Sequence, residues 1–229
     1  YHTCMISVII PTVQKKLKIL KKLLEILTKD SCVDEILVIN NKPDVELNYY
    51  YIPKVKICTP ERNLYVNASW NLGISLIKND NFVLMNDDML VCDDFCKKVI
   101  SSVVFKDSNT GLIGCSNSFI KNVGDVEILE QPVVDSNNLI YFERLDKYLS
   151  TGDWGISIFG KKENYYTIPN DFKIIYGDNY LLYNNIKKSK INYKICNLPV
   201  NHVHSASSLN PEFSSVVCDD INNAKKFFQ

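Results

Sequence analysis

The sequence predicts an α/β fold, in which a mostly parallel sheet lies between helices. Short apolar runs typical of buried strands alternate along the chain with longer amphipathic segments typical of helices. The chain has 229 residues, 46% of them hydrophobic, so it can bury a sizeable core without disulfides or metal ions. Strands that alternate with helices favour parallel pairing through right-handed crossovers.

The first half of the chain shows this alternation clearly. Residues 4–11 form an apolar run that ends at a proline, as expected of a buried strand. Residues 14–28 carry leucines at helical spacing on one face and lysines over much of the rest, which predicts a helix that covers the sheet. The next predicted strands are residues 35–40, 55–58 and 82–85, and the next predicted helices are residues 65–78 and 93–104.

The second half is less regular. Residues 111–116 predict another strand, whereas residues 119–150 show no clean period. The remaining predicted elements are strands at 156–159 and 191–196 and helices at 178–189 and 215–228. Because no repeat or low-complexity linker interrupts the sequence, we expect one continuous domain over residues 1–229.

Charge and hydropathy exclude several classes of protein. The 26 basic and 26 acidic residues balance, so the chain has no broad positive field with which to attract a phosphate backbone, and we expect no nucleic-acid partner. The apolar runs are far shorter than the ~18 to 20 residues that cross a bilayer, so no transmembrane segment is expected. No signal peptide is expected within the chain either.

The eight cysteines predict a compartment. They are spread through apolar stretches without a compact spacing pattern, so we expect buried free thiols rather than a disulfide framework. Cys92 and Cys96 are the closest pair, and no CxxC motif or paired histidine accompanies them, which argues against a zinc site. The sequence therefore favours a reducing, cytoplasmic environment.

Polar residues follow the predicted strands at the point where each one ends. The first strand is followed by Thr12, the second ends at Asn40, and the fourth is followed by Asn86, Asp87 and Asp88. Ligands of open α/β sheets bind beyond the carboxyl ends of the strands, so these side chains are expected to line one rim. Adjacent carboxylates suit Mn²⁺ or Mg²⁺, which prefer oxygen ligands. A turn or a helix N-cap at Asp87 or Asp88 is the alternative.

Several segments, taken in order, resemble a known family. They are residues 6–12 and 35–41 as the first two strands, then Asn63 to Ile74 with Asn71 eight residues after Asn63, and then residues 83–88, 154–162, 176–178 and 202–205. Together they resemble the family 2 glycosyltransferases of GT-A fold, with residues 83–88 at the place of the DxD motif. The resemblance implies a single, Rossmann-like GT-A domain with a mixed, mostly parallel sheet. Residues up to about 116 would bind the nucleotide sugar, and residues 117–229 the acceptor.

The resemblance implies roles for individual residues. Asp88 is expected to bind the metal, Mn²⁺ or Mg²⁺. Asp178 is expected to act as the general base, with Asp153 as the alternative base. Trp154 is expected either to stack on an acceptor sugar or to be buried in the core. The residues expected to bind the donor are Pro11, Thr12, Asn40, Asn63, Asn71, Asn86 and Asp87.

A late metal-binding histidine is also implied by the resemblance. We expect His202 and His204 to point to opposite sides of an extended stretch over residues 200–206, so that one of them reaches the metal. His204 is favoured because Ser205 and Ser207 follow it and offer hydroxyls to diphosphate oxygens, and His202 is the second choice. Neutral imidazole is a good ligand of Mn²⁺.

The chain departs from the family pattern at several positions. Tyr65 replaces the usual Gly after Asn63, and Asn86 replaces the first Asp of DxD. Asn40 stands where an Asp commonly reads the nucleobase, so the choice of nucleotide stays open. Where the family often has Glu-Asp, this chain has Asp178 followed by Asn, which leaves one carboxylate as the local base.

The function implied by the resemblance is metal-dependent, inverting transfer of a sugar from a nucleotide-diphosphate sugar to a glycan or other hydroxyl acceptor. A metal would stabilise the diphosphate leaving group, and a carboxylate would take the proton of the acceptor hydroxyl. A catalytically inactive sugar- or nucleotide-binding GT-A module is the alternative, because Asn40 and Asn86 replace the usual acids. A sugar-nucleotide pyrophosphorylase would need a Gly-rich basic loop after the first strand, and residues 11–14 do not form one.

Overall fold

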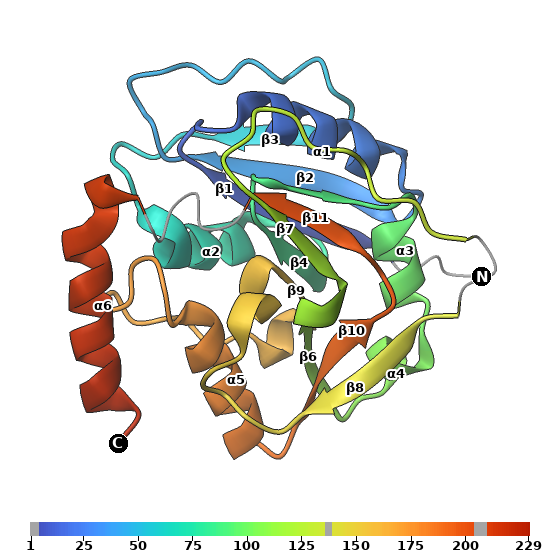
Figure 1. Ribbon diagram of the computed structural model, residues 1–229, viewed down its shortest axis with the longest axis vertical. Helices are drawn as coiled ribbons and strands as arrows, with labels where there is room; N and C mark the ends of the chain where they lie inside the picture. Colours follow the sequence, from blue (N-terminus) through green and yellow to red (C-terminus); the bar gives the residue numbers. More distant parts are fainter. Residues whose placement is uncertain (1–4, 136–138, 204–209) are drawn as a thin grey trace.

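A central sheet of eight strands runs through the molecule (Figure 1). The computed structural model describes residues 5–135, 139–203 and 210–229. In spatial order the strands are β3 (Val55–Cys58), β2 (Val33–Asn40), β1 (Ile6–Thr12), β4 (Asn81–Met85), β9 (Ser157–Lys161), β6 (Thr110–Cys115), β10 (Ile191–Cys196) and β8 (Tyr141–Leu145).

The pairing of these strands is mixed and mostly parallel. Strand β1 pairs in parallel with β2 and β4, β2 with β3, and β10 with β6. Strand β9 runs antiparallel to both β4 and β6, and β8 runs antiparallel to β10. The predicted α/β class with a mixed, mostly parallel sheet is therefore confirmed.

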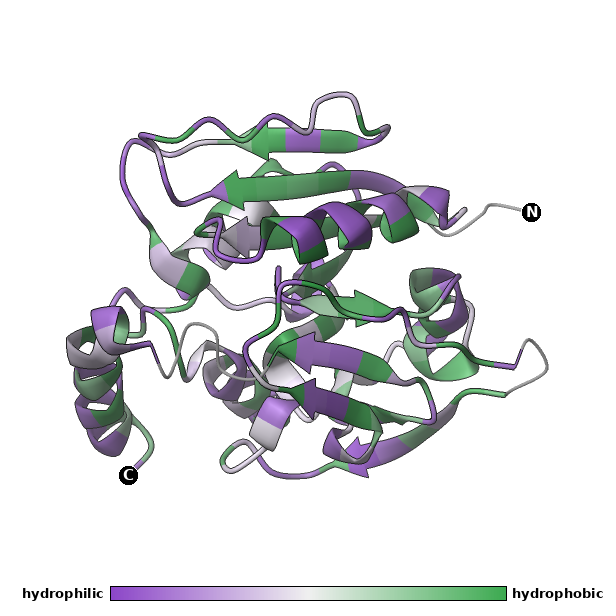
Figure 2. Ribbon diagram, turned by 45° about the horizontal axis from the view of Figure 1, so that its top comes forward, coloured by the Kyte–Doolittle hydropathy of each residue, from purple (hydrophilic) through white to green (hydrophobic). Residues whose placement is uncertain are grey.

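Helices cover both faces of the sheet, which separates two hydrophobic clusters. Ile6, Val8 and Ile10 of β1 belong to the cluster under α1, whereas Ile9 belongs to the cluster with α2 and α5. In Figure 2 the ribbon of β2 is coloured mostly hydrophobic, whereas the ribbons of α1 and α6 alternate between hydrophilic and hydrophobic residues. Such burial on both faces explains the continuous apolar runs of the sequence. The helices are α1 (Leu17–Lys29), α2 (Tyr65–Leu76), α3 (Phe95–Ile100), α4 (Val103–Lys106), α5 (Gly177–Lys187) and α6 (Ser214–Phe227).

Among the described residues, no helix is both long and apolar enough to cross a membrane. The longest helix of the described residues, α6, has 14 residues and lies at one side of the molecule (Figure 1). The ring of Phe227 at its end packs against Tyr180 and Tyr183 of α5.

A second, smaller sheet joins distant parts of the chain beside the carboxyl end of β4. It has the order β5 (Met89–Val91), β11 (Val200–Val203) and β7 (Ile120–Val123). Strand β11 runs antiparallel to β5 and parallel to β7, so that His202 lies between Met89 and Asn122 in the register. The sequence analysis expected an extended segment from residue 200 but neither β5 nor β7, because strands this short carry no readable periodicity.

One predicted helix is wrong as a single element. Residues 93–104 form the two short helices α3 and α4, which are interrupted at Ser101 and Ser102. The backbone of Ser102 is extended, and its hydroxyl accepts a hydrogen bond from the backbone N–H of Phe105 at 3.1 Å. A serine that caps the next turn in this way offers the backbone an alternative to continuing the helix.

Candidate active site

A cavity of about 580 Å³ lies at the carboxyl ends of the parallel strands. It is lined by residues that the sequence analysis placed in both halves of the chain. Among the predicted site residues, those that line it are Pro11, Thr12, Asn63, Asn86, Asp87, Asp88, Asp153, Asp178 and His202. The rim predicted from strand ends is therefore also the wall of a cavity large enough for a small ligand.

Asp87 is held at the rim by the first strand. Its Oδ2 accepts a hydrogen bond from Thr12 Oγ1 at 2.5 Å, and the same hydroxyl accepts one from the backbone N–H of Gln14 at 2.9 Å. Burial, together with the adjacent Asp88 carboxylate, raises the pKa of Asp87 to about 7. Two carboxylates this crowded repel each other, and a bound cation would relieve that repulsion.

Asp88 faces a histidine across the cavity wall. The residue is 4% exposed, and its Oδ1 lies 3.3 Å from His202 Nε2. Within the part of the chain that the structure describes, this oxygen is a buried acceptor with no hydrogen-bond donor. Adjacent ligands of an octahedral ion with bonds of about 2.1 Å lie roughly 3 Å apart, so this separation suits two ligands of one ion.

The protein can supply few metal ligands here. No group of three or more His, Cys, Asp or Glu side chains is arranged to hold a metal within residues 5–135, 139–203 and 210–229. Asp88 and His202 would therefore hold Mn²⁺ or Mg²⁺ together with oxygens from a bound diphosphate and water, which is the usual arrangement for ions of this kind. The carboxylate of Asp88 and the imidazole of His202 are therefore suitable ligands for the Mn²⁺ or Mg²⁺ that the family resemblance implies.

Among the described residues, the histidine that lines the cavity is His202, which was the second choice. His204 lies outside the described residues, as do Ser205 and Ser207. The expectation that the two imidazoles point to opposite sides rests on a premise that does not hold for a regular strand, because side chains two apart in a strand share a face. His202 is 4% exposed within β11, and the backbone N–H of the next residue, Val203, donates to Asp88 O at 2.9 Å.

Asp178 lies in the first turn of α5, on the side of the cavity formed by the second half of the chain. A Cβ added to Gly155 would come within 2.6 Å of Asp178 Oδ2, so the glycine makes room for the carboxylate. Burial raises the pKa of Asp178 to about 6, although backbone N–H groups at the helix start oppose the shift. A carboxylate with a raised pKa is a stronger base than a free aspartate.

Asp153 also lines the cavity, and it is engaged from two sides. Its Oδ2 accepts a hydrogen bond from Asn122 Nδ2 at 2.8 Å, and its backbone N–H donates to Asn117 Oδ1 at 3.0 Å. These contacts tie Asp153 to the segment around the small sheet.

Trp154 does not face the acceptor side, which corrects its assignment as a stacking residue. The side chain is 1% exposed, and Nε1 donates to Tyr193 O at 2.9 Å. The indole packs directly over Gly114 of β6, where any added Cβ would overlap the ring. Trp154 is therefore a core residue with a satisfied donor, the second of the two roles expected for it.

Two of the residues that were expected to bind the sugar donor, Asn40 and Asn71, are not among those that line the cavity. Asn40 is fully buried, and its amide bonds Gln14 Nε2 at 2.9 Å and Val45 O at 3.0 Å. Asn71 donates to Ile168 O at 2.9 Å and accepts from the same residue's N–H at 3.0 Å. The amide of Asn40 therefore holds the loops at Gln14 and Val45. The amide of Asn71 holds the loop at Ile168.

A strained turn shapes the donor side of the cavity. Tyr65 has a φ of 59°, in the left-handed region that favours glycine, and its N–H donates to Asn63 Oδ1 at 2.7 Å. Its ring meets that of Phe213 edge to face, with centroids 6.2 Å apart, and both residues line the cavity. Such strain persists only where surrounding contacts over-determine it, and it is concentrated at functional sites.

Several cavity residues escaped the sequence analysis. Asn41, directly after Asn40, lines the cavity, as do Trp70, Tyr176 and Phe213. Asp220 of α6 supports the same wall from behind: it is fully buried and accepts the backbone N–H groups of residues 173–175 at 2.7–2.9 Å, directly before the turn that leads to Asp178. Asn41 and Tyr176 carried a signal, since Asn41 also follows a predicted strand and Tyr176 begins the segment 176–178 that resembles the family.

Comparison with known proteins identifies the class of this molecule. Residues 7–164 match the sequence profile of glycosyl transferase family 2. The structure resembles that of S. aureus TarS 1-349 with a TM-score of 0.56 and 13% identity, over 97% of this chain and 72% of that one. It also resembles GalNAc-T7, solved with UDP, GalNAc and Mn²⁺, with a TM-score of 0.67 and 11% identity, over 98% of this chain and 48% of that one.

The fold is thus the GT-A glycosyltransferase fold. The chain belongs to glycosyl transferase family 2. It spans about half the length of the GalNAc-T7 chain that it resembles. No curated protein matches the sequence significantly.

Proposed function

We propose that the chain is a metal-dependent, inverting glycosyltransferase that moves a sugar from a nucleotide-diphosphate sugar to a glycan or other hydroxyl acceptor, in glycan synthesis. The observation that carries the proposal is that one cavity is lined by acidic residues from both halves of the chain. Asp87 and Asp88 lie at the strand ends with His202, and Asp178 lies in the wall from the second half of the chain.

The donor half of the cavity suits a diphosphate leaving group. Asp88 and His202 would hold Mn²⁺ or Mg²⁺, and GalNAc-T7, a protein of the same fold, was solved with Mn²⁺. When bound, the metal supplies positive charge that stabilises the negative charge growing on the diphosphate as the glycosidic bond breaks. Thr12 holds the neighbouring Asp87 in place, and Asn63 and Asn86 offer amides to the rest of the donor.

The acceptor half supplies a base. Asp178, with its pKa raised to about 6 by burial, is mostly ionised at neutral pH and binds a proton more tightly than a free aspartate does. It would accept the proton of the acceptor hydroxyl while that oxygen attacks the sugar in a single displacement. Inversion is inferred from family 2 membership.

Donor hydrolysis tests this proposal against the inactive-module alternative, which the substituted Asn40 and Asn86 favour. The protein is incubated with UDP-, GDP- and dTDP-sugars with and without Mn²⁺, and the released nucleoside diphosphate is measured. Slow, Mn²⁺-dependent release from one donor supports the enzyme. Complete absence of release across the panel, with a thermal shift from the same donors, supports a binding module.

We also propose a single domain over residues 1–229 and a reducing, cytoplasmic environment. The sheet supports the first proposal, because β6, β9 and β10 continue the surface formed by β1 to β4. The cysteines support the second: most of the described ones are buried, and none of these takes part in a disulfide.

A further inference from the structure

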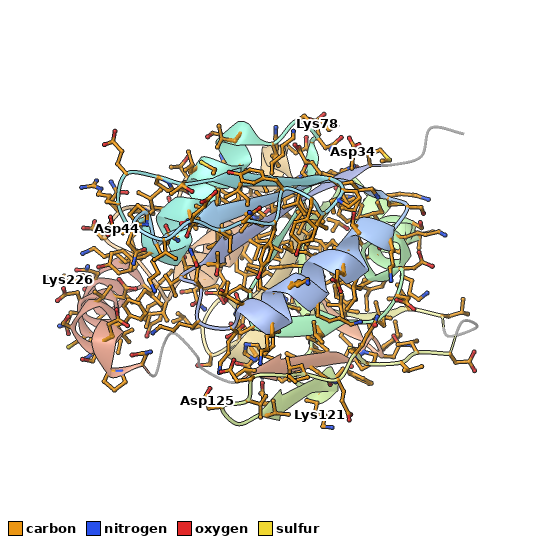
Figure 3. The ribbon with its side chains drawn as sticks, turned by 90° about the horizontal axis from the view of Figure 1, so that it is seen from above. Asp34, Asp44, Lys78, Lys121, Asp125 and Lys226 are labelled. Atoms are coloured by element: carbon orange, nitrogen blue, oxygen red, sulfur yellow. The ribbon has the colours of Figure 1, made fainter. Side chains whose placement is uncertain are left out.

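Asn122 connects a histidine and an aspartate of the cavity wall, His202 and Asp153, without lining the cavity itself. The residue is exposed on β7, opposite His202 in the register of the small sheet. Its Oδ1 lies 2.9 Å from His202 Nδ1, and its Nδ2 donates to Asp153 Oδ2 at 2.8 Å. Figure 3 locates this strand by the neighbouring Lys121, on the side of the molecule opposite Asp34 and Lys78.

The chemistry of these contacts determines the tautomer of the histidine. An ionised carboxylate only accepts hydrogen bonds, so Asp153 requires the NH₂ group of Asn122 on its side. The amide oxygen must then face His202, and an oxygen without a proton requires a donor there. His202 Nδ1 therefore carries the proton in the neutral imidazole, and Nε2 carries the lone pair.

That lone pair faces another acceptor. His202 Nε2 lies 3.3 Å from Asp88 Oδ1, an oxygen for which the described residues provide no donor. Two acceptors at this distance repel each other unless a cation lies between them. This tautomer directs the Nε2 lone pair toward Asp88 Oδ1, where one metal ion would bind both atoms.

We propose that Asn122, anchored by Asp153, is a positioning residue that fixes the tautomer and orientation of His202 for metal binding. The inference rests on the proposed function, because it concerns the metal of that same site. It gives Asp153 a role in holding Asn122, which leaves Asp178 as the base. Partners of this kind, behind a metal-binding histidine, set which nitrogen is available and typically change affinity 10- to 100-fold.

The tautomer can be observed directly in the metal-free protein. The chain has three histidines, so long-range proton–nitrogen spectra of protein labelled with ¹⁵N-histidine are simple, and His202→Gln assigns the signal. With EDTA present at about pH 8.5, His202 is expected to show a protonated Nδ1 and an unprotonated Nε2. A protonated Nε2 in the wild-type protein would overturn the proposal.

Variants separate positioning from mere stability. Asn122→Ala should lose the single Nδ1–H signature and weaken Mn²⁺ binding, followed by electron paramagnetic resonance with the metal alone, by about 10- to 100-fold. Asn122→Asp combined with Asp153→Asn retains an acceptor for Nδ1–H and reverses the donor and acceptor between residues 122 and 153, so it should retain the tautomer. Asn201→Ala, on the adjacent strand β11, removes an amide that donates to Glu130 O at 2.7 Å, and it should change neither readout.

The outcomes distinguish this inference from the proposed function. Unchanged tautomer and Mn²⁺ affinity in Asn122→Ala would refute the positioning role even if the wild-type protein transfers sugar. The expected changes in a protein that releases no nucleoside diphosphate from any donor would support the positioning role and reject the enzymatic proposal.

Discussion

Buried and half-buried carboxylates lie at both ends of the parallel strands, and their surroundings differ sharply. At the amino ends, Glu35 accepts hydrogen bonds from Ser7 Oγ at 2.6 Å, Lys56 Nζ at 2.8 Å and the backbone N–H of Lys78 at 2.6 Å. Burial alone would raise the pKa of Glu35, but these donors outweigh it, so the pKa lies below its ordinary value. Figure 3 shows the neighbouring pair Asp34 and Lys78 at this edge, whose charged atoms are 2.7 Å apart.

At the carboxyl ends the carboxylates have fewer donors. Within the described part of the chain, Asp87 has one side-chain donor, Thr12, and the donors to Asp178 are backbone N–H groups at the start of α5, so burial raises the pKa of both. The comparison teaches that the number of hydrogen-bond donors around a carboxylate, rather than its burial, decides its role. A carboxylate with several donors is structural, and one with few donors is available for chemistry. Each prediction below tests that distinction.

The largest expected effect is on turnover. Asp178→Asn should lower sugar transfer by ~10² to 10⁴-fold with nearly unchanged donor affinity, because a general base acts in the transition state more than in donor binding. Initial rates and calorimetric donor affinity measure the two effects. Glu35→Gln, at the opposite edge, is the matched control and should leave turnover of the folded protein unchanged. Full activity of Asp178→Asn would move the role of base to Asp153.

Asp88→Asn should abolish metal-dependent donor binding while the fold stays intact. Asn keeps the size and one oxygen ligand but removes the charge that a hard dication requires, so the Mn²⁺-dependent part of the affinity should fall by on the order of 10²-fold. Calorimetry with UDP and Mn²⁺ measures the affinity, and circular dichroism checks the fold. If Mn²⁺-dependent affinity stays unchanged, Asp88 is a turn residue, as the alternative interpretation holds.

Stability should respond in opposite directions at the two edges. Glu35→Gln should lower the free energy of unfolding by about 1–3 kcal/mol, because its three hydrogen-bond donors lose a buried, charged acceptor. Asp178→Asn should raise it by on the order of 1–3 kcal/mol at neutral pH, because a buried group whose ionisation is unfavourable becomes neutral. Urea denaturation measures both, and a loss of stability in both variants would refute the contrast.

The pH dependence follows from the same shifts. Since the folded pKa of Asp178 is raised to about 6, its ionised form destabilises the fold above that pH, and this penalty fades as the pH falls toward the unfolded value of 3.8. Glu35 behaves oppositely: its contribution is present above 4.5 and is lost as the pH falls through its lowered folded pKa.

Activity should show the same titration. The value of kcat/KM is expected to fall about tenfold per pH unit below pH ~6, since the base must be ionised. The pH profile of initial rates measures this limb. A limb near pH 4, typical of an unperturbed aspartate, would contradict the assignment.

The smallest expected effect concerns the backbone at the donor rim. Tyr65 has positive φ, so Tyr65→Gly should be more stable than Tyr65→Ala by about 1 kcal/mol, the reverse of the usual order in helices. Both variants remove the ring that meets Phe213, so the difference between them isolates the backbone. Urea denaturation of the two proteins is the measurement, and greater stability of the alanine variant would argue against strain at this turn.

Much of the donor rim was predictable from local sequence. An apolar run followed by polar residues is enough to place Thr12 and Asp88 at the carboxyl ends of parallel strands, and the structure puts both in the cavity wall. The same reasoning failed for Asn40, because a residue at a strand end points either to the cavity or into a neighbouring loop, and Gln14 and Val45 capture this amide.

The sequence by itself therefore determined the α/β alternation and the rim, since both depend on periodicity within short windows. Tertiary structure decided the residues that complete the site. It buried Trp154 over Gly114, and it brought His202 and Asn122 together with Asp88 through a small sheet whose strands are three or four residues long. These contacts depend on pairing between strands that are distant in the sequence, since His202 and Asn122 are separated by 80 positions in the chain. No short window of the sequence contains both partners.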